Sequence, residues 1–555
     1  MTGPDIPAAK RAGLPVDLDR LTADGDDWLS AEERYALKMH GVCAQAQPGA
    51  FMVRVRIPGG RLGAAAARGV AGIADAHGRG WIHLTTRQQL ELHHIDARDV
   101  TTVLDAVAAL GLTTSSTCGH TLRNVMACPD AGVSIDEPFD CHPDARAVSD
   151  AILARSAELN CRLPSRVNVA FGGCPPCRDH ARTNDAGFVS TVREDGALGY
   201  ELYAGGSAGK APFFAIPLAA FVPRAEVVAA AEALIEVYAT HGDLDRPAKG
   251  RMKFLIRSLG EERFVALFTD AFARARTRPR PEPVPVSAPE DTALAEVLAC
   301  APPGGWGSGV RPQRTPGRAM VTVAVPLGDV DGEDLRMLAA LSEGAADATL
   351  YLTRNQNVRL RDVALDAVPL VRERLSACGL SLEGADQAVD VRACTGGPVC
   401  ALAITPAQAI GAALAGHLSM VRNTGLRVHV SGCPNSCAQH QIADLGFSGG
   451  KVTVNGTPVL GYQVWLGGDV PAGVFGRIVG RVAEADVPAI TEAIVGVWES
   501  LRVHGETLSR TVNRLGLEPF KAHIDAVCAG RWAPGPEPDD VAAAERELPL
   551  VGAAR

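Results

Sequence analysis

The sequence predicts an α+β fold in which a duplicated unit packs as two copies about a pseudo-twofold axis. Runs that alternate apolar and polar residues, FMVRVRI (51–57) and AMVTVAV (319–325), predict strands, because successive side chains of a strand face opposite sides of a sheet. Apolar residues at helical spacing predict helices over residues 225–239 and 486–504. Because strands and helices mix within each copy, helices layered against sheets are the expected architecture.

The duplication rests on matching segments that recur in the same order along the chain. The matches pair AQAQPGAFMVRVRIPGG (44–60) with PQRTPGRAMVTVAVPLG (312–328), LTTRQQLEL (84–92) with LTRNQNVRL (352–360), GGCPPCRDHARTNDAGF (172–188) with SGCPNSCAQHQIADLGF (431–447), and GYELYAGG (199–206) with GYQVWLGG (461–468). Chance explains one such match but hardly a collinear series, so we expect a repeated unit of roughly 200 residues.

The repeats and the proline-rich segment RTRPRPEPVPVSAPED set the expected domain boundaries. The expected parts are an N-terminal tail (1–27), repeat 1 (28–115 and 116–276), a linker (277–305), repeat 2 (306–385 and 386–530) and a C-terminal tail (531–555).

The bulk composition excludes several classes of protein. A net charge of −9 argues against nucleic acid as a partner, because a phosphate backbone favours a basic surface. The longest stretch without Asp, Glu, Lys or Arg, residues 393–421, contains prolines and polar residues, so we expect no membrane span. The 14 cysteines, with no apolar signal segment in residues 1–27, favour the reducing cytoplasm.

Four cysteines of the second copy have the number and setting that an iron–sulfur cluster needs. Cys394 and Cys400 lie in CTGGPVC, and Cys433 and Cys437 lie in CPNSC. Such clusters are held by four thiolates, and the neighbouring glycines and prolines allow tight turns around the inorganic core. A structural zinc site or free core cysteines remain alternatives on spacing alone.

CTGGPVC followed by VHVSGCPNSCAQHQIADLGFSGG resembles the signature of the siroheme-containing nitrite and sulfite reductases. The resemblance extends roughly from residue 35 to residue 515 and includes both copies. It implies that the four cysteines bind one [4Fe–4S] cluster and that Cys437 also bridges to the siroheme iron. It further implies that residues 28–115 and 306–385 are ferredoxin-like half-domains, and that residues 116–276 and 386–530 bind siroheme, with substrate in the first and the cluster in the second.

The same resemblance implies a set of catalytic residues in the first copy. They are Arg54, Arg123, Arg166 and Asn168. A small oxyanion needs fixed positive charge and hydrogen-bond donors, which these side chains supply. The second copy has Thr322 in place of Arg54, which suggests that one copy binds substrate while the other holds the cluster. Arg56 is expected on the same face of the strand as Arg54.

By resemblance, further residues hold the siroheme. They are Arg87, Gln88, Arg251, Lys253, Asn435 and Cys437. Arginine suits the carboxylates of the macrocycle because its planar fork binds them at two points. A solvated helix face is the alternative for Arg251 and Lys253. His83 stands where relatives often have arginine, which leaves one carboxylate contact open.

The expected reaction is the six-electron reduction of nitrite to ammonia, with electrons from ferredoxin or a similar one-electron donor. Asn168 favours nitrite, because sulfite-type members tend to carry a second lysine there, whereas Arg166 departs from both patterns. Assimilatory sulfite reduction is the alternative on the same scaffold. A precorrin ring-contraction enzyme and a non-enzymatic iron–sulfur protein are the more distant alternatives.

The first copy has its own cysteines, Cys128, Cys174 and Cys177. It lacks a partner for Cys128 at the C-x5-C position, so we expect buried thiols of a decayed copy. A second metal site is the alternative.

Overall fold

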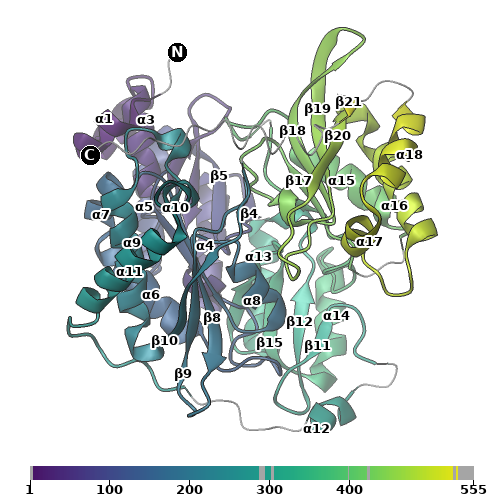
Figure 1. Cartoon of the computed structure of the whole chain (residues 1–555), viewed down its shortest axis with the longest axis horizontal. Helices are drawn as coiled ribbons and strands as arrows, with labels where there is room; N and C mark the ends of the chain where they lie inside the picture. Colours follow the sequence, from purple (N-terminus) through teal and green to yellow (C-terminus); the bar gives the residue numbers. More distant parts are fainter. Residues whose placement is uncertain are drawn as a thin grey trace. The chain divides into compact units, whose positions relative to one another are not determined.

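The computed structural model describes residues 4–209, 211–286, 294–301, 305–397, 399–421, 425–528 and 533–534 (Figure 1). The chain forms two compact units: unit 1 is Met1–Ser207, Phe213–Val323 and Asp329–Leu382, and unit 2 is Ala208–Pro212, Ala324–Gly328 and Glu383–Arg555. Parts of the expected linker and most of the expected C-terminal tail lie outside the described residues. None of the described helices has the length and apolar character needed to cross a membrane.

Unit 1 contains two similar five-stranded sheets, one from each copy. The first sheet has the order β1 (Val42–Ala44), β2 (Ala50–Val55), β5 (Leu90–Asp96), β4 (Ile82–Leu84) and β13 (Asp329–Val330). The second has the order β11 (Val310–Pro312), β12 (Arg318–Val323), β15 (Val358–Ala364), β14 (Thr349–Leu352) and β3 (Arg61–Gly63). Each sheet therefore ends on a short strand that belongs to the other copy. The strands predicted at 51–57 and 319–325 are confirmed as β2 and β12.

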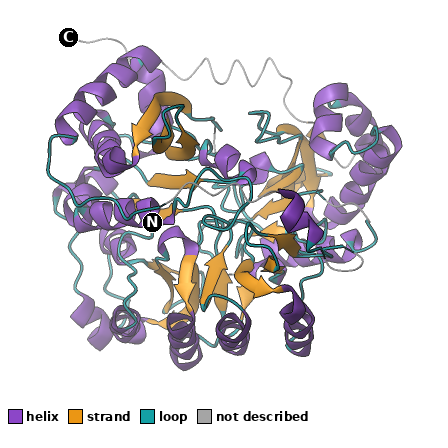
Figure 2. Cartoon of the chain, turned by 90° about the horizontal axis from the view of Figure 1, so that it is seen from below, coloured by secondary structure: helices purple, strands orange, loops and turns teal. Residues whose placement is uncertain are grey.

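Helices cover these sheets, and Figure 2 shows a row of helices on the lower side of the central strands. They are α4 (Ala64–His77), α5 (Val100–Ala109), α13 (Gly332–Ala345) and α14 (Val368–Ala377). Val70, Val103, Leu338 and Val371 on these helices are fully buried, so each helix turns an apolar stripe to the core.

Two glutamines at equivalent positions tie the copies together. Gln88 Nε2 donates to the carbonyl of Leu352 at 2.8 Å, and Gln356 Nε2 donates to the carbonyl of Leu84 at 2.9 Å. Both glutamines have a positive φ, 55° and 65°, in the turns after β4 and β14. A Cβ on Gly60 would lie 2.7 Å from the Leu352 carbonyl oxygen, so only glycine allows this approach.

The third sheet of unit 1 has the order β10 (Ile216–Pro223), β9 (Leu198–Ala204), β8 (Ala186–Val192), β7 (Val167–Gly172) and β6 (Leu122–Met126). The helices α6 (His142–Ala154), α9 (Val227–His241) and α11 (Glu261–Ala275) pack with it through one apolar core. The helix predicted over 225–239 is confirmed as α9. Phe171 and Phe188 stack at 4.7 Å between ring centroids inside this core.

The sheet of unit 2 has the order β16 (Arg392–Ala393), β17 (Val428–Ser431), β18 (Leu445–Val454), β19 (Thr457–Leu466), β20 (Arg477–Ala483) and β21 (Ala533–Pro534). Its helices are α15 (Ala407–Leu418), α16 (Val487–Leu501), α17 (Leu508–Leu515) and α18 (Glu518–Cys528). The directions of β16 to β20 repeat those of β6 to β10: two parallel pairings are followed by two antiparallel ones. This correspondence confirms the predicted duplication.

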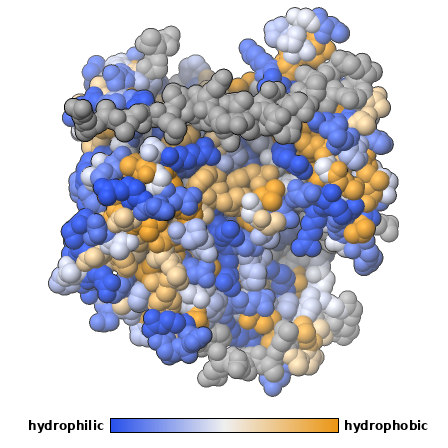
Figure 3. Space-filling view, viewed as in Figure 1, coloured by the Kyte–Doolittle hydropathy of each residue, from blue (hydrophilic) through white to orange (hydrophobic). Residues whose placement is uncertain are grey.

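The first 27 residues contain two helices, α1 (Ile6–Arg11) and α2 (Leu18–Asp24). Ala9 and Leu21 on these helices are buried. Lys10 Nζ donates to the carbonyl of Leu163 at 2.8 Å, so this segment packs on the third sheet's domain. On the face shown in Figure 3 hydrophilic and hydrophobic residues are interspersed, as is usual for a protein surface.

Candidate active site

The cluster cysteines of unit 2 lie at the ends of two neighbouring strands. β16 and β17 run parallel, so the residues that follow them meet at one edge of the sheet. Cys394 follows β16 directly, and Cys433 and Cys437 follow β17. Burial, together with the thiols of Cys437, Cys400 and Cys433, raises the pKa of Cys394 well above its ordinary value. The four predicted ligands are therefore neighbours in unit 2.

The backbone around these cysteines is packed closely enough to require glycine. Gly432 N donates to Cys394 Sγ at 3.2 Å, and a Cβ on Gly432 would lie 2.9 Å from the Thr405 carbonyl oxygen. Gly396 has a φ of 59°. Backbone N–H groups that point at sulfur are the second shell that iron–sulfur clusters need, so this site fits a four-thiolate cluster.

Asn435 lies between the last two cluster cysteines. Burial raises the pKa of Cys433 to about 11, and hydrogen bonds from the backbone and side chain of Asn435 act against that rise. Asn435 therefore contacts the sulfur of Cys433. Cys437 is exposed, whereas Cys433 is buried, so the last cysteine is the accessible thiol of the CPNSC segment.

The first copy repeats this arrangement of parallel strands with different side chains. Arg123 lies on β6 and Asn168 on the parallel neighbour β7. Arg54 Nη1 donates to the carbonyl of Thr117 at 3.1 Å, and Arg123 Nη1 donates to the same oxygen. One carbonyl thus joins the guanidinium groups of two predicted catalytic residues that are far apart in sequence.

Arg54 is held by a carboxylate that the sequence analysis did not identify. Arg54 on β2 and Glu91 on β5 are paired in register, and Arg54 Nε donates to Glu91 Oε1 at 3.1 Å. Although burial by itself raises the pKa of Glu91, the Arg54 guanidinium holds it well below its ordinary value. The sequence shows a charged residue in each of these two strands, Arg54 and Glu91. Their pairing could be inferred only by knowing that β2 and β5 are neighbours in the sheet.

A group of basic side chains gathers in unit 1. Its members, all predicted to hold substrate or cofactor, are Arg87, Arg123, Arg166, Arg251 and Lys253. Burial and the charges of Arg251, Arg123 and Arg87 lower the pKa of Arg166 well below its ordinary value. Burial and the charge of Arg251 lower the pKa of Lys253 to about 7. Within the part of the chain that the structure describes, Arg166 forms no hydrogen bond or salt bridge.

Asp185 is a second residue that the sequence analysis missed. It is fully buried and accepts from Asn168 N at 2.9 Å and from Arg251 Nη2 at 2.9 Å. Asp444 occupies the matching position of the second copy and accepts from Arg427 N at 2.9 Å. The signal was present, because an aspartate stands in both copies of the repeat that contains the last cysteines.

Polar atoms near these residues are left for a ligand. Asn168 Oδ1 and Arg251 Nε are buried and have no hydrogen-bond partner among the described residues. Buried polar atoms are normally paired, so each unpaired one indicates a ligand or water. The donor set of guanidinium, ammonium and amide groups fits a macrocycle that carries several carboxylates, together with a small anion.

Three other residues named from the sequence serve the scaffold. Gln88 also donates to the carbonyl of Ala127 at 2.8 Å and accepts from Ala127 N, so its amide is occupied by backbone. Arg56 is fully buried and donates to the carbonyls of Ser116, Leu122 and Arg123.

His83 is likewise tied to the protein itself. Its Nδ1 lies 2.6 Å from Asp329 Oδ1, which comes from the second copy. Burial alone lowers the pKa of a histidine, but the Asp329 carboxylate outweighs it and raises the pKa of His83.

Unit 2 has four neighbouring thiols, and unit 1 has a cationic group in which Arg166 forms no salt bridge with the described residues. Family models match both units: "Nitrite and sulphite reductase 4Fe-4S domain" at residues 118–275 and 384–529, and "Nitrite/Sulfite reductase ferredoxin-like half domain" at residues 44–110 and 311–378. The chain therefore belongs to the nitrite and sulfite reductase family. It is an oxidoreductase whose cofactors are siroheme and a [4Fe–4S] cluster.

Named relatives and a solved structure agree with this assignment. Ferredoxin–nitrite reductase of Synechococcus elongatus is 32% identical over 439 residues, which cover 76% of this chain and 81% of that protein. Sulfite reductase (ferredoxin) 1 of Mycolicibacterium paratuberculosis is 30% identical over 426 residues, which cover 75% and 73%. The structure of Mycobacterium tuberculosis NirA protein matches with a TM-score of 0.79 at 25% identity and covers 94% of this chain and 98% of that one. The predicted family, fold class and cofactors are confirmed.

Proposed function

We propose that the protein reduces nitrite to ammonia with six electrons delivered singly by ferredoxin. The balanced reaction takes one nitrite, six electrons and eight protons to one ammonium ion and two waters. The observation that carries the proposal is the half-buried Arg166, which faces three other arginines and forms no salt bridge within the described residues. A bound anion removes the repulsion in such a group, which makes anion binding favourable.

Each predicted residue has a part in this proposal. Arg54, Arg123, Arg166 and Asn168 hold the oxyanion, and Arg87, Arg251, Lys253 and Asn435 hold the carboxylates and edge of the siroheme, with Gln88 positioning the segment beside them. Cys394, Cys400, Cys433 and Cys437 would hold the cluster, and Cys437 would also contact the siroheme. When bound, the siroheme would supply an iron site for the anion, and the cluster would supply electrons.

Protons must reach the anion as its oxygens leave as water. Arginine keeps its proton near neutral pH and therefore binds the anion without releasing it. Lys253, with a pKa of about 7 from burial and the charge of Arg251, holds a proton at Nζ that is exchangeable near neutral pH. We assign proton supply to Lys253 and to water, and anion binding to the arginines.

In this proposal nitrite is preferred over sulfite because of the residue at position 168. Asn168 has a neutral amide, whereas a lysine there would add a positive charge that favours the more highly charged sulfite. Relatives named as ferredoxin–nitrite reductases support this choice, including the Zea mays enzyme at 31% identity over 78% of this chain and 74% of its own length. Sulfite reduction stays the second candidate, because the group of arginines and Lys253 also suits a larger, more charged anion.

The test is a side-by-side assay of the holoenzyme with reduced methyl viologen and either nitrite or sulfite. The expected result is a higher kcat/KM for nitrite, and a shift of that ratio toward sulfite in Asn168→Lys. A wild-type preference for sulfite would replace the proposal with the second candidate. Equal ratios in wild type and Asn168→Lys would remove Asn168 as the residue that sets the choice.

A further inference from the structure

Three cysteines of the first copy, Cys128, Cys174 and Cys177, come together in unit 1. Cys128 lies just past the end of β6, and Cys174 lies just past the end of the parallel strand β7. These are the strand ends that correspond to β16 and β17, which carry the cluster cysteines in unit 2. The duplicated scaffold therefore builds a thiol site at the same sheet edge twice.

The spacing of the sulfur atoms fits one ion and not a cluster. All three Sγ atoms lie within 4.8 Å of one another, and Cys128 Sγ is 3.1 Å from Cys174 Sγ. Bonds of 2.3 Å to a tetrahedral zinc ion hold sulfur atoms about 3.8 Å apart. Thiolates of a four-iron cluster bind different irons and are held farther apart than that.

The local backbone has the form of a zinc-binding turn. Cys174 and Cys177 form a C-x2-C pair in GGCPPC, one of the spacings that zinc sites use. Cys177 N donates to the Cys174 carbonyl at 3.0 Å, which closes the turn at the start of α8 (Pro175–Ala181). Cys128 and Cys174 are buried and Cys177 is half-buried, so the group is shielded from solvent.

Glu137 is the candidate for the fourth ligand that three thiolates leave open. Its side chain is fully buried, and its Oε2 has no hydrogen-bond partner among the residues that the structure describes. Gly173, which precedes Cys174, leaves room beside it: a Cβ there would lie 3.2 Å from Glu137 Oε2 and 3.8 Å from the Cβ of Cys128. The unpaired carboxylate oxygen of Glu137 and the Cys128 side chain thus border the same glycine.

Arginines from the second copy surround this group and balance its negative charge. Arg311 and Arg359 bind Asp130, which lies two residues after Cys128. Arg314 Nη2 lies 3.6 Å from Glu137 Oε1.

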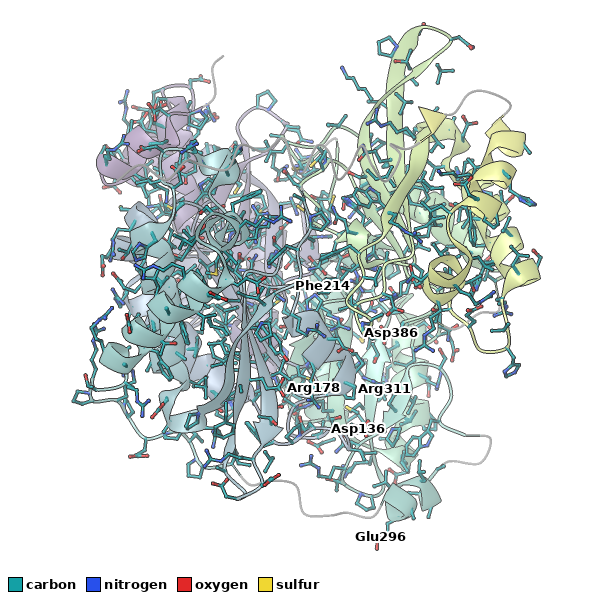
Figure 4. All side chains as sticks on the ribbon, viewed as in Figure 1. Asp136, Arg178, Phe214, Glu296, Arg311 and Asp386 are labelled. Atoms are coloured by element: carbon teal, nitrogen blue, oxygen red, sulfur yellow. The ribbon has the colours of Figure 1, made fainter. Side chains whose placement is uncertain are left out.

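The backbone of the two cysteine segments is held in the same way. Arg361 Nη1 donates to the Ala131 carbonyl, and Arg354 Nη1 donates to the Pro176 carbonyl at 2.6 Å. Arg178, which follows Cys177, and Arg311 are labelled at the lower centre of Figure 4. Three thiolates and two carboxylates carry more negative charge than one zinc ion cancels, so these cations allow the site to bind metal inside the protein.

We propose that Cys128, Cys174, Cys177 and Glu137 bind one structural zinc ion. The three thiols lose their protons when the ion binds, and no electron is transferred. The ion joins the loop after β6 to the turn after β7. It replaces our expectation that these cysteines are buried thiols of a decayed copy.

The first test is metal analysis of the purified holoenzyme, followed by X-ray absorption at the zinc edge. The expected content is about one zinc beside about five iron atoms, four in the cluster and one in the siroheme. The expected zinc shell is three sulfurs near 2.3 Å and one oxygen near 2.0 Å. Absence of zinc, or an iron count near nine, would overturn the proposal. A disulfide between Cys128 and Cys174 in the zinc-free protein would overturn it in favour of a redox pair.

The second test uses variants with zinc content as the readout. Cys177→Ser, at the least buried ligand, and Glu137→Gln should lose zinc while keeping the siroheme spectrum. Cys300→Ser is the matched control, because Cys300 Sγ donates to the Glu296 carbonyl instead. Zinc retained in both ligand variants would place the ion elsewhere and refute the site. If a variant does not fold, the zinc-edge spectrum of the wild type decides alone.

Discussion

Replacing Glu91 by glutamine tests how the predicted anion residue Arg54 is held. Glu91 accepts from Arg54 Nε at 3.1 Å and is also 3.3 Å from His93 Nε2. Its side chain is 9% exposed, so water does little to replace the lost charge. The amide keeps the shape and a neutral hydrogen bond but leaves the Arg54 charge without its partner.

The expected cost follows from these contacts. Hydrogen bonds to charged groups contribute about 1.5–3 kcal/mol, so we expect Glu91→Gln to lose about 2 kcal/mol of unfolding free energy. In a domain of 150–250 residues that would lower Tm by about 4–8 °C, and we expect a smaller fall in the larger unit 1. The uncompensated Arg54 charge should also tighten anion binding. A charge roughly 8 Å away changes the binding free energy by about 0.5–2 kcal/mol, so the KM for nitrite should fall about two- to thirtyfold.

The pH dependence has a definite sign. Arg54 holds the pKa of Glu91 below its ordinary value of 4.5. The stabilisation is therefore fully present above pH 4.5 and is lost as the pH falls through the lower pKa of the folded state. The Tm difference between wild type and Glu91→Gln should be constant between pH 6 and 8 and shrink in acid.

The assay is calorimetry across pH, with viologen-linked nitrite kinetics on the same samples. Glu343→Gln is the control, because Glu343 pairs with Arg68 on the solvent-exposed surface. Its replacement should change Tm little. An unchanged Tm in Glu91→Gln at neutral pH, or a difference that does not shrink in acid, would refute the reasoning.

Three further changes test the scaffold and the cofactor sites. Gln88→Leu and Gln356→Leu each remove buried hydrogen bonds between the two copies, so each should lower Tm. An unchanged Tm in either variant would count against the exchange of strands between the copies. Gly432→Ala places a Cβ 2.9 Å from a carbonyl oxygen and should abolish the cluster absorbance, and a normal spectrum would contradict that close approach. Asp185→Asn leaves Arg251 with a weaker hydrogen-bond partner. When siroheme is limiting, the siroheme content measured by absorbance should fall by at least about tenfold. Full siroheme occupancy in this variant would show that Asp185 does not support the site.

Much of the fold was available from the sequence because local pattern and repetition determine it. Alternation predicted β2 and β12, and periodicity predicted α9 and α16, where buried residues such as Leu234 and Ile494 face their cores. The repeats predicted that the two copies connect their strands in the same way. The sheets formed by β6 to β10 and by β16 to β20 share the same strand directions. The sequence did not indicate that β3 and β13 pair in the other copy's sheet, since strands of three and two residues have no readable period.

Candidate site residues could be predicted where they belong to a sequence motif. The carboxylates that pair with the candidate arginines were not predicted, because no motif marks them as site residues. Within unit 2 the cluster cysteines lie near one another, and within unit 1 the basic residues gather, because motif positions follow strand ends. Glu91 and Asp185 were missed because their roles depend on which strands pair and on which side chain lies across the sheet. The proposed zinc site has no recognisable motif in the sequence, because Glu137 lies between the two cysteine segments.

The two copies differ most informatively at one equivalent pair of positions. In the first copy Arg54 lies opposite Glu91, and in the second copy Thr322 lies opposite Arg359. Each sheet thus has one arginine at this pair, but on different strands and with different partners. Arg54 turns to Thr117 in the predicted anion site, whereas Arg359 binds Asp130 beside the thiols of the first copy. The arginine thus lies on the first strand of the pair in one copy and on the second strand in the other. In the first copy Arg54 is available to the predicted anion site, and in the second copy Arg359 stabilises the first copy through Asp130.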